Sequence, residues 1–514
     1  MKKRRVRFAP SPTGPLHMGG VRTALYNYLY AKQAGGDFIL RIEDTDSQRF
    51  VPGAEAYIIE SLRWCGILPD EGVDAEGHIV ETPSERHPHA PYRQSQRKPI
   101  YRRYAEELIE KGLAYYAFDT AEELGALRAE AEAAKQTFTY NAATRGKLRN
   151  SLTLPADEVA RLLEQTNDWT VRFKMPENRI VAMDDLIRGH IEVNPDTLDD
   201  KVLWKRADEL PTYHLANIVD DHLMEVTDVI RGEEWLPSLP LHYLLYEAFG
   251  WERPAFAHLS LLLKPDGKGK LSKRDGDRLG FPVFPLKWIS PDGEESRGYR
   301  EDGYYPEAFV NMLALLGWNP GTEQELFTLD ELAKAFSLDR VVRSGAKFNP
   351  EKAKWFNQEY LRMRPVEVLT AEFKALAPEM TAGRSDDYIG AVLSLMRERA
   401  HFAKELPEMT RFFFEAPKAY DEASVAKFWK DDVPGIMPQV REFLAGVEPF
   451  SREKLEEALP ALIHEREWPM GKVMNTLRLM MIGVAQGPGM ADLLSILGKD
   501  EVLARMDRAI KTLA

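Results

Sequence analysis

RFAPSPTGPLHMGG, the sequence of residues 7–20, places three prolines, three glycines and one histidine between an apolar dipeptide and a helical pattern. The next stretch, residues 21–36, repeats apolar residues at three- and four-residue spacing and ends in two glycines, which often terminate helices. Residues 37–46 are a short β-rich run that ends in acidic residues. The predicted order of strand, loop, helix and strand opens an α/β domain of the nucleotide-binding type.

The loop has the composition of a phosphate-binding segment. Gly19 and Gly20 lie where the predicted helix begins, and a helix N-terminus presents backbone N–H groups and a positive dipole end to an anion. His17 offers a ring donor for phosphate oxygens. The loop alone leaves a second interpretation open, in which the prolines and glycines only make turns and His17 is an ordinary surface histidine. Neither a Walker loop nor a dinucleotide-type glycine triad is present.

A second glycine-flanked loop, residues 264–278, concentrates positive charge. By itself it fits a solvated basic loop or a nucleic-acid contact. It also fits a mobile clamp whose lysines neutralise a polyphosphate as it leaves. The basic residues that it concentrates are Lys264, Lys268, Lys270, Lys273 and Arg274.

Composition narrows the class of protein. A chain of 514 residues is long enough for several domains, and no apolar run is long enough to cross a bilayer. The basic start, residues 1–10, lacks the apolar stretch of a secretory signal, so we expect a cytoplasmic protein. Cys65 is the only cysteine, which excludes an intrachain disulfide and zinc sites built on paired thiolates. The net charge of −13 argues against nonspecific coating of nucleic acid.

Patterning along the chain suggests separate parts. Residues 99–135 look helical, and their charged pattern is typical of solvated helices. Short β-rich runs return at residues 169–175, so the segment between looks inserted. Residues 282–305 are rich in Pro, Gly, Asp and Ser, as in a long loop, and helical periodicity dominates from residue 348 onward.

The two loops together carry a resemblance to a known family. HMGG at residues 17–20 and KLSKR at residues 270–274 resemble the paired signatures, HIGH and KMSKS, of class I aminoacyl-tRNA synthetases. The sequence resembles the bacterial-type glutamyl-tRNA synthetases more closely, in the family's order and over nearly the whole chain. The stretches that carry this are residues 7–20, 41–46, 92–118, 211–224, 229–235, 270–274, 306–318 and 348–362.

The resemblance implies an α/β fold with a Rossmann-like class I catalytic domain in residues 1–105 and 211–255. It implies an inserted α+β domain in residues 106–210 that grips the acceptor end of tRNA. Residues 256–345 would be a stem-contact domain with the KLSKR loop, and residues 346–514 an all-helical anticodon-binding domain. Glutaminyl-type enzymes have a β-barrel at that end, so the helical pattern favours the glutamyl type.

The resemblance also implies site residues. The expected reaction is ATP-dependent formation of glutamyl-adenylate, followed by transfer of glutamate to the 3′ end of tRNA(Glu). The residues expected to bind ATP are His17, Gly19, Gly20, Lys270, Ser272 and Lys273, of which His17, Lys270 and Lys273 would be catalytic. The residues expected to bind glutamate are Arg7 and Arg231 at its carboxylates, Glu43 at its ammonium, and Ser11, Tyr213 and Asn217. Candidates for anticodon contacts are Lys352, Lys354, Trp355 and Arg478.

Several positions depart from the commonest family pattern. Gly20 replaces a second histidine, and Leu271 and Arg274 replace methionine and serine, which are variants similar to those of glutamyl-type enzymes. Ala117 stands where zinc-binding members have cysteine, so no zinc is expected, and Mg2+ would arrive with ATP. Residues 281–303 look longer than usual, and the sequence assigns them no role.

The resemblance implies a monomer and leaves open whether tRNA(Gln) is charged as well. Three rivals remain at this point. A tRNA-modifying paralogue would lack the anticodon part, and a small-molecule nucleotidyltransferase would need no large RNA-binding appendage. A catalytically silent RNA-binding scaffold would bind ATP without turnover.

Overall fold

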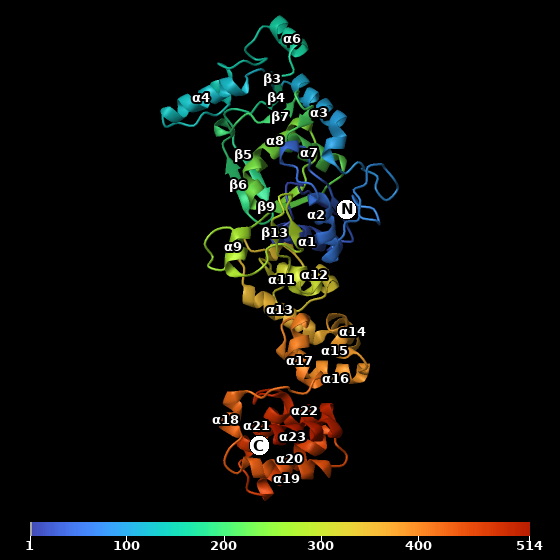
Figure 1. Cartoon of the computed structure of the whole chain (residues 1–514). Coiled ribbons are helices and arrows are strands. Elements are labelled where there is room, and N and C mark those ends of the chain that lie inside the picture. The colour runs from blue at the N-terminus through green and yellow to red at the C-terminus, as the bar shows by residue number, and fades with distance from the viewer. Residues whose placement is uncertain (1–2, 514) are drawn as a thin grey trace. The chain divides into compact units, whose positions relative to one another are not determined.

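A computed structural model describes residues 3–513 and divides the chain into two compact units, Met1–Ala353 and Lys354–Ala514. The first unit mixes strands and helices, and the second is helical (Figure 1). The predicted fold class is therefore confirmed. Within residues 3–513, no helix combines the length and the apolar character that a membrane span requires.

The opening motif forms a parallel β–α–β unit, as predicted. Strand β1 (Arg5–Phe8) pairs with β2 (Asp37–Leu40), with Arg7 opposite Ile39, and helix α1 (Met18–Gln33) connects them. The predicted 3.6-residue apolar pattern is the buried face of this helix, which includes Val21, Leu25 and Leu29. Burying such side chains contributes about 1.5–3 kcal/mol each and fixes the end of the loop before α1.

A second sheet has the order β6-β5-β10-β9 and lies beside this unit. Strands β9 and β10 pair in parallel, and β1 lies beside β9, where the Thr227 N–H donates to the Arg5 carbonyl at 2.9 Å. In Figure 1 the blue α1 and the green β9 therefore lie together although they are far apart in sequence. The strands are β5 (Val181–Asp185), β6 (Gly189–Val193), β9 (Asp228–Gly232) and β10 (Ala255–Leu259).

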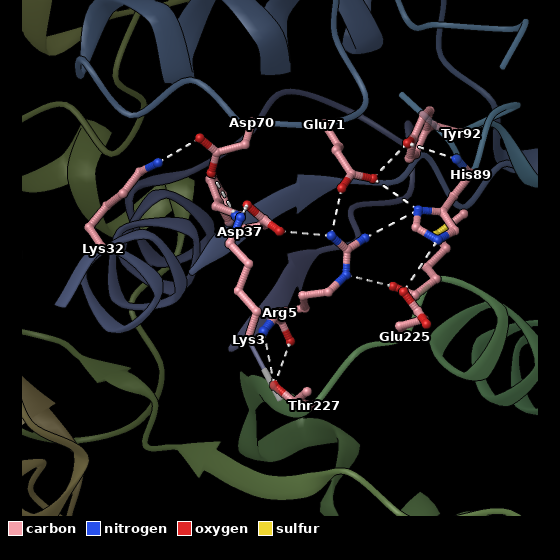
Figure 2. A network of polar contacts seen from close by, with 12 residues as sticks. Lys3, Arg5, Lys32, Asp37, Asp70, Glu71, His89, Tyr92, Glu225 and Thr227 are labelled. Carbon is pink, nitrogen blue, oxygen red and sulfur yellow. Dashed lines mark hydrogen bonds and ion pairs between the residues drawn. The ribbon is translucent and has the colours of Figure 1, made fainter. Parts of the chain in front are cut away.

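A polar network anchors the amino-terminal end of β1. Figure 2 shows the Arg5 guanidinium reaching Asp37 on β2, Glu71 and His89. The Tyr92 hydroxyl donates to Glu71 at 2.7 Å. This network ties β1 and β2 to the segment of residues 70–92, which the sequence pattern left unassigned.

A third sheet, antiparallel and ordered β3-β4-β7-β8, falls within the region predicted to be an insertion, residues 106–210, apart from the last residue of β8. The predicted helical run of residues 99–135 is wrong in its middle, because Gly112 at φ +70° ends the first helix and a four-residue strand follows. Strands β5 and β6, although they fall within predicted domain 106–210, belong to the sheet of β9 and β10. The elements are α3 (Lys98–Glu110), β3 (Ala114–Ala117), α4 (Ala121–Ala133), α5 (Ala142–Arg145), α6 (Ala156–Gln165), β4 (Thr170–Phe173), β7 (Val202–Lys205) and β8 (Leu210–Pro211).

The rest of the first unit is mostly helical. The predicted long loop of residues 282–305 contains a short hairpin and one helical turn, and is otherwise irregular. The elements are α2 (Ala54–Trp64), α7 (Tyr213–Leu223), α8 (Leu239–Phe249), β11 (Leu262–Leu263), α9 (Lys273–Leu279), β12 (Trp288–Ile289), β13 (Glu295–Ser296), α10 (Tyr299–Asp302), α11 (Pro306–Leu315), α12 (Leu329–Ala335) and β14 (Ala346–Lys347).

The predicted helical region from residue 348 onward is confirmed. Its helices form two neighbouring groups, α14–α17 and α18–α23 (Figure 1). The helices are α13 (Pro350–Met363), α14 (Val366–Leu376), α15 (Pro378–Thr381), α16 (Asp386–Met396), α17 (Leu406–Phe414), α18 (Glu422–Phe428), α19 (Val433–Ala445), α20 (Arg452–Glu465), α21 (Met470–Ile482), α22 (Met490–Leu497) and α23 (Lys499–Leu513).

Candidate functional site

A cavity of about 620 Å³ joins the two loops that the sequence singled out. The opening loop contributes His17 and Gly19 to its wall, and the basic loop contributes Lys270, Ser272 and Lys273. The two motifs are about 250 residues apart in sequence, so their meeting in one cavity is a result of the fold. The size suits a nucleotide, since small-molecule sites have volumes of roughly 300–1,000 Å³.

His17 caps helix α1 with its side chain. Its Nδ1 accepts from the N–H groups of Gly19 at 3.0 Å and Gly20 at 3.3 Å. Met18 N–H donates to the Val283 carbonyl at 2.8 Å. The first amides of α1 thus already have protein acceptors, so a phosphate here would meet the His17 ring and not the free backbone amides that the sequence suggested.

The capping contacts also fix the protonation of His17. The ring is open to the cavity, yet the protein atoms around it desolvate it and, together with the Lys270 ammonium, lower its pKa. A neutral ring that accepts at Nδ1 carries its proton on Nε2. His17 therefore offers a single neutral N–H donor to a phosphate.

The two glycines have separate steric reasons. A Cβ on Gly19 would lie 2.9 Å from His17 Cε1, so Gly19 makes room for the capping ring. A Cβ on Gly20 would meet Leu16 Cδ1 at 2.4 Å, and Gly20 is not among the residues that line the cavity. Both glycines support the loop, and only Gly19 faces the cavity.

The basic loop is a hairpin that leads into a capped helix. Leu271 N–H donates to the Leu262 carbonyl at 2.8 Å, and Ser272 is the N-cap of α9, with its hydroxyl bonded to the Asp275 carboxylate. The Lys273 ammonium lies 2.7 Å from Glu294, on the connection between β12 and β13. Ser272 therefore positions the loop, while Lys273 is held by an exposed ion pair that a phosphate can replace.

The expected glutamate residues gather at the carboxyl ends of the parallel strands. Arg7, on β1, forms a two-point ion pair with Asp221 through Nε at 3.0 Å and Nη2 at 3.2 Å. Arg41, directly after β2, donates to Asp221 at 2.8 Å and to Glu43 at 3.1 Å. Asn217 also donates to Glu43, at 3.2 Å. All five side chains are buried, and this network orients Arg7 and Glu43.

Arg231 has a different environment from Arg7. It is 5% exposed, and among the described residues no carboxylate lies within ion-pair distance of it. Its guanidinium donates to Tyr213 Oη at 2.8 Å, to His258 Nε2 at 3.0 Å and to His242 Nδ1 at 3.3 Å. A buried guanidinium surrounded by neutral acceptors is a suitable partner for a substrate carboxylate.

Electrostatics link the two arginines through Tyr213. Burial raises the pKa of Tyr213 to about 12, Arg231 and Arg7 act against this rise, and Glu43 adds to it. Tyr213 therefore lies within the field of both arginines and of Glu43. Ser11, the remaining expected glutamate residue, lies on the wall of the nucleotide cavity.

The two buried carboxylates differ in their titration. Burial raises the pKa of Glu43, and Arg41, Arg7 and Asn217 offset this only in part. Burial acts in the same direction on Asp221, but Arg7 and Arg41 outweigh it and hold its pKa below the usual value. Asp221 is the fixed counter-ion, whereas Glu43 is the carboxylate that an added ammonium would stabilise.

Sequence reasoning missed the residues that orient these side chains, namely Arg41, Asp221, His258 and Asp275. Signals existed for two of them. Adjacent acids in the apolar helix LANIVDDHL require buried cations, and the order Ser-x-x-Asp in LSKRD is a helix-capping pattern. His258 had no local signal, because its partners come from other strands.

The residues expected to contact the anticodon, and the position at which zinc-binding family members have cysteine, are on other elements. Lys352 pairs with Glu325 at 2.7 Å, Trp355 is half-buried against Phe356, and Arg478 is on α21. Ala117 is buried on β3. In the described part of the chain, no three His, Cys, Asp or Glu side chains form a group that could hold a metal ion.

Comparisons with known proteins cover the whole chain. Residues 3–355 match the model of the family "tRNA synthetases class I (E and Q), catalytic domain", and residues 364–510 match "Anticodon binding domain". The chain is 55% identical to the glutamate–tRNA ligase of Bacteroides fragilis and 54% identical to that of Bacteroides thetaiotaomicron, over 100% of this chain and 99% of each relative.

A solved structure agrees with these relatives. It is the crystal structure of a glutamate tRNA ligase from Elizabethkingia meningosepticum in complex with its amino acid, with a TM-score of 0.93, 52% identity and complete coverage of both chains. The cavity between the two signature loops and the buried Arg7 and Arg231 fit the same family. The chain belongs to the glutamate–tRNA ligases among the class I aminoacyl-tRNA synthetases.

Proposed function

We propose that this protein activates L-glutamate with ATP and transfers it to the 3′ end of tRNA(Glu). The glutamate α-carboxylate attacks the α-phosphorus of ATP and pyrophosphate leaves. A hydroxyl of the terminal adenosine then attacks the acyl carbon, and AMP leaves. The observation that carries this proposal is the single cavity lined by both signature loops, next to the buried Arg231.

Each loop has a role in the first step. His17 donates from Nε2 to an ATP phosphate, and Lys270 and Lys273 neutralise the charge that moves to pyrophosphate. Ser272 keeps Lys273 at the cavity through its contact with Asp275. Magnesium would enter with ATP and keep several waters, and Glu234 in the cavity wall is the candidate carboxylate to meet it.

The amino-acid pocket selects by charge. Arg7 and Arg231 take the two carboxylates of glutamate, Glu43 takes its ammonium, and Ser11, Tyr213 and Asn217 complete the pocket. The uncharged end of glutamine would leave a guanidinium without its anionic partner, which is costly in a buried site.

The larger partner is tRNA. We propose that residues 106–210 hold the acceptor end and residues 346–514 read the anticodon, with Lys352, Lys354, Trp355 and Arg478 as candidate contacts. We also propose that the protein is a cytoplasmic monomer. The anticodon-domain match over residues 364–510 speaks against the tRNA-modifying paralogue and the small nucleotidyltransferase.

The pocket assignment is tested by Arg231→Gln in the full-length enzyme. We expect the KM for glutamate to rise by roughly 100-fold while the KM for ATP stays within about threefold, because a charge-assisted contact is lost. Arg179→Gln is the matched control, since Arg179 is exposed and pairs only with Glu247 in the described chain. An unchanged KM for glutamate in Arg231→Gln would contradict the assignment.

A further inference from the structure

Three side chains on neighbouring strands, Arg231, His258 and Asp185, form a series of hydrogen bonds that ends at the glutamate pocket proposed above. Arg231 on β9 and His258 on β10 are direct register partners, and β10 also pairs with β5, which ends at Asp185. The strands are parallel, so the three side chains lie at the carboxyl edge of one sheet. His258 and Asp185 are fully buried, with exposed fractions of 0% for both side chains.

The contacts determine which atom donates and which accepts in each of these hydrogen bonds. Asp185 Oδ2 lies 2.6 Å from His258 Nδ1, and His258 Nε2 lies 3.0 Å from Arg231 Nε. Arginine can only donate, so His258 accepts at Nε2 and carries its proton on Nδ1, which it donates to Asp185. Asp185 is itself held by the backbone N–H groups of Ile187 and Arg188, at 2.9 and 2.8 Å.

Because His258 stands between Arg231 and Asp185, the Arg231 N–H groups are not occupied by a carboxylate as they would be in a direct ion pair. Arg7 is bound at two points by Asp221, so part of its guanidinium is already occupied by a carboxylate. At Arg231 no carboxylate of the described residues lies within ion-pair distance, and Asp185 is reached through the His258 imidazole. Asp185 thus supplies negative charge to a buried cation without competing for the N–H groups that a substrate carboxylate needs.

Burial lowers the pKa of His258 and of the neighbouring His242, so both rings are neutral acceptors. His242 Nδ1 lies 3.3 Å from Arg231 Nη1, and its Nε2 lies 3.3 Å from His214 Nδ1. His258 differs from His242 because only His258 is backed by an acid. This singles out His258 as the residue that fixes the Arg231 plane.

We propose that the Asp185–His258 pair is a positioning unit of the glutamate pocket, which holds Arg231 through a neutral imidazole and keeps it available for the substrate carboxylate. This inference rests on the function proposed above. It makes His258 a positioning residue for amino-acid binding, with no contact to ATP.

Two substitutions at His258 separate positioning from packing, because each variant keeps one of the two hydrogen bonds of His258, either to Asp185 or to Arg231. Asparagine has its amide near the Nδ1 position and keeps the Asp185 contact, while glutamine reaches the Nε2 position and keeps an acceptor for Arg231. We expect His258→Asn to raise the KM for glutamate by about 10-fold or more, as loss of a charged hydrogen bond does, and His258→Gln to stay within about threefold. The KM for ATP stays unchanged in both.

Asp185→Asn provides the same test from the other end. The oxygen of its amide can still accept from the two backbone N–H groups, but its NH2 group would donate to His258 Nδ1. The ring proton then moves to Nε2, where it faces the Arg231 N–H as a second donor. We expect the KM for glutamate to rise as in His258→Asn, so Asp185→Asn carries the test if His258→Asn does not fold. His87→Asn is the control, since His87 is buried and accepts from Gly72 outside this pocket.

Equal effects of His258→Asn and His258→Gln on glutamate, or parallel changes in both KM values, would show a merely structural histidine. A folded His258→Asn enzyme with the wild-type KM for glutamate would also overturn the inference. If Arg231→Gln raises that KM while His258→Asn and Asp185→Asn do not, the inference alone is wrong. If Arg231→Gln also leaves the KM for glutamate unchanged, the pocket assignment itself is wrong.

Discussion

His17 shows how one side chain serves both the fold and the site. Its Nδ1 caps helix α1 while its Nε2 remains for a phosphate, and Gly19 leaves the space in which the ring folds back. A histidine at this position without the following glycine would therefore not adopt the same orientation.

We predict that Gly19→Ala displaces the His17 ring, because the new Cβ would lie 2.9 Å from Cε1. Loss of the cap costs about 1 kcal/mol of stability, and the turnover number falls because the Nε2 donor moves. Thermal unfolding and steady-state charging measure the two effects. Gly125→Ala in α4 is the control, since its Cβ meets nothing within 4 Å and should stabilise by about 0.5–1 kcal/mol. Wild-type turnover in Gly19→Ala would refute this role.

Glu43 gives the pocket a pH dependence. Its pKa is raised above the ordinary value of 4.5 by burial, and only the ionised form can hold an ammonium group. As pH falls, Glu43 is protonated earlier than an exposed glutamate, so the KM for glutamate begins to rise at a pH above 4.5. In Glu43→Gln this KM should be high throughout, without that rise. A Glu43→Gln enzyme with the same pH profile as the wild type would contradict the assignment.

Short elements hold the basic loop that lines the cavity. The hairpin that contains Lys270 continues into α9, and the segment between β12 and β13 supplies Glu294 to Lys273. Residues 281–303, to which the sequence assigned no role, thus hold the counter-ion of the basic loop.

We predict that Lys273→Ala lowers the rate of glutamate activation by roughly 100-fold, since a charge is removed where pyrophosphate leaves. Thermal stability should change by less than about 1 kcal/mol, because the Lys273–Glu294 pair is exposed. Lys268→Ala in the same loop is the matched control and should activate glutamate normally. A rate of glutamate activation in Lys273→Ala equal to the normal rate of Lys268→Ala would show that Lys273 has no role in the mechanism.

The network that anchors β1 predicts acid sensitivity (Figure 2). Burial would raise the pKa of Glu71, but hydrogen bonds with His89, Arg5 and Tyr92 prevail and lower it from 4.5 to about 2. A depressed carboxyl pKa stabilises the fold above pH 4.5, and this contribution of about 3 kcal/mol is lost as pH falls from 4.5 to 2.

Urea unfolding of the wild type and Glu71→Gln as a function of pH measures this contribution. The difference in the free energy of unfolding between the two proteins should be largest near neutral pH and shrink below pH 4.5. A difference that is independent of pH would contradict the role of the Glu71 charge.

The whole molecule shows which features the sequence could reveal. Periodicity predicted α1, β2 and the helical region after residue 348, because those signals are local. The strand β3 was hidden between two helical patterns, since only Gly112 and four residues mark the change.

The site was predictable where a motif carries it and not where contacts cross the fold. The two signature loops are local patterns, and their resemblance to the paired family signatures implies a shared phosphate site. The Arg7 partner Asp221 lies 214 residues away, and His258 meets Arg231 only through the register of β9 and β10. Such partners require the sheet order, which no local pattern contains.

The most direct test of the enzyme is charging of purified tRNA(Glu) and tRNA(Gln) with labelled glutamate, ATP and the full-length protein. We expect label at the 3′ end of tRNA(Glu), with one AMP and one pyrophosphate formed per glutamate attached. Label on tRNA(Gln) as well would mark an enzyme that does not discriminate between the two acceptors. A folded protein that binds ATP but labels neither tRNA would contradict the proposed function and favour a silent RNA-binding scaffold.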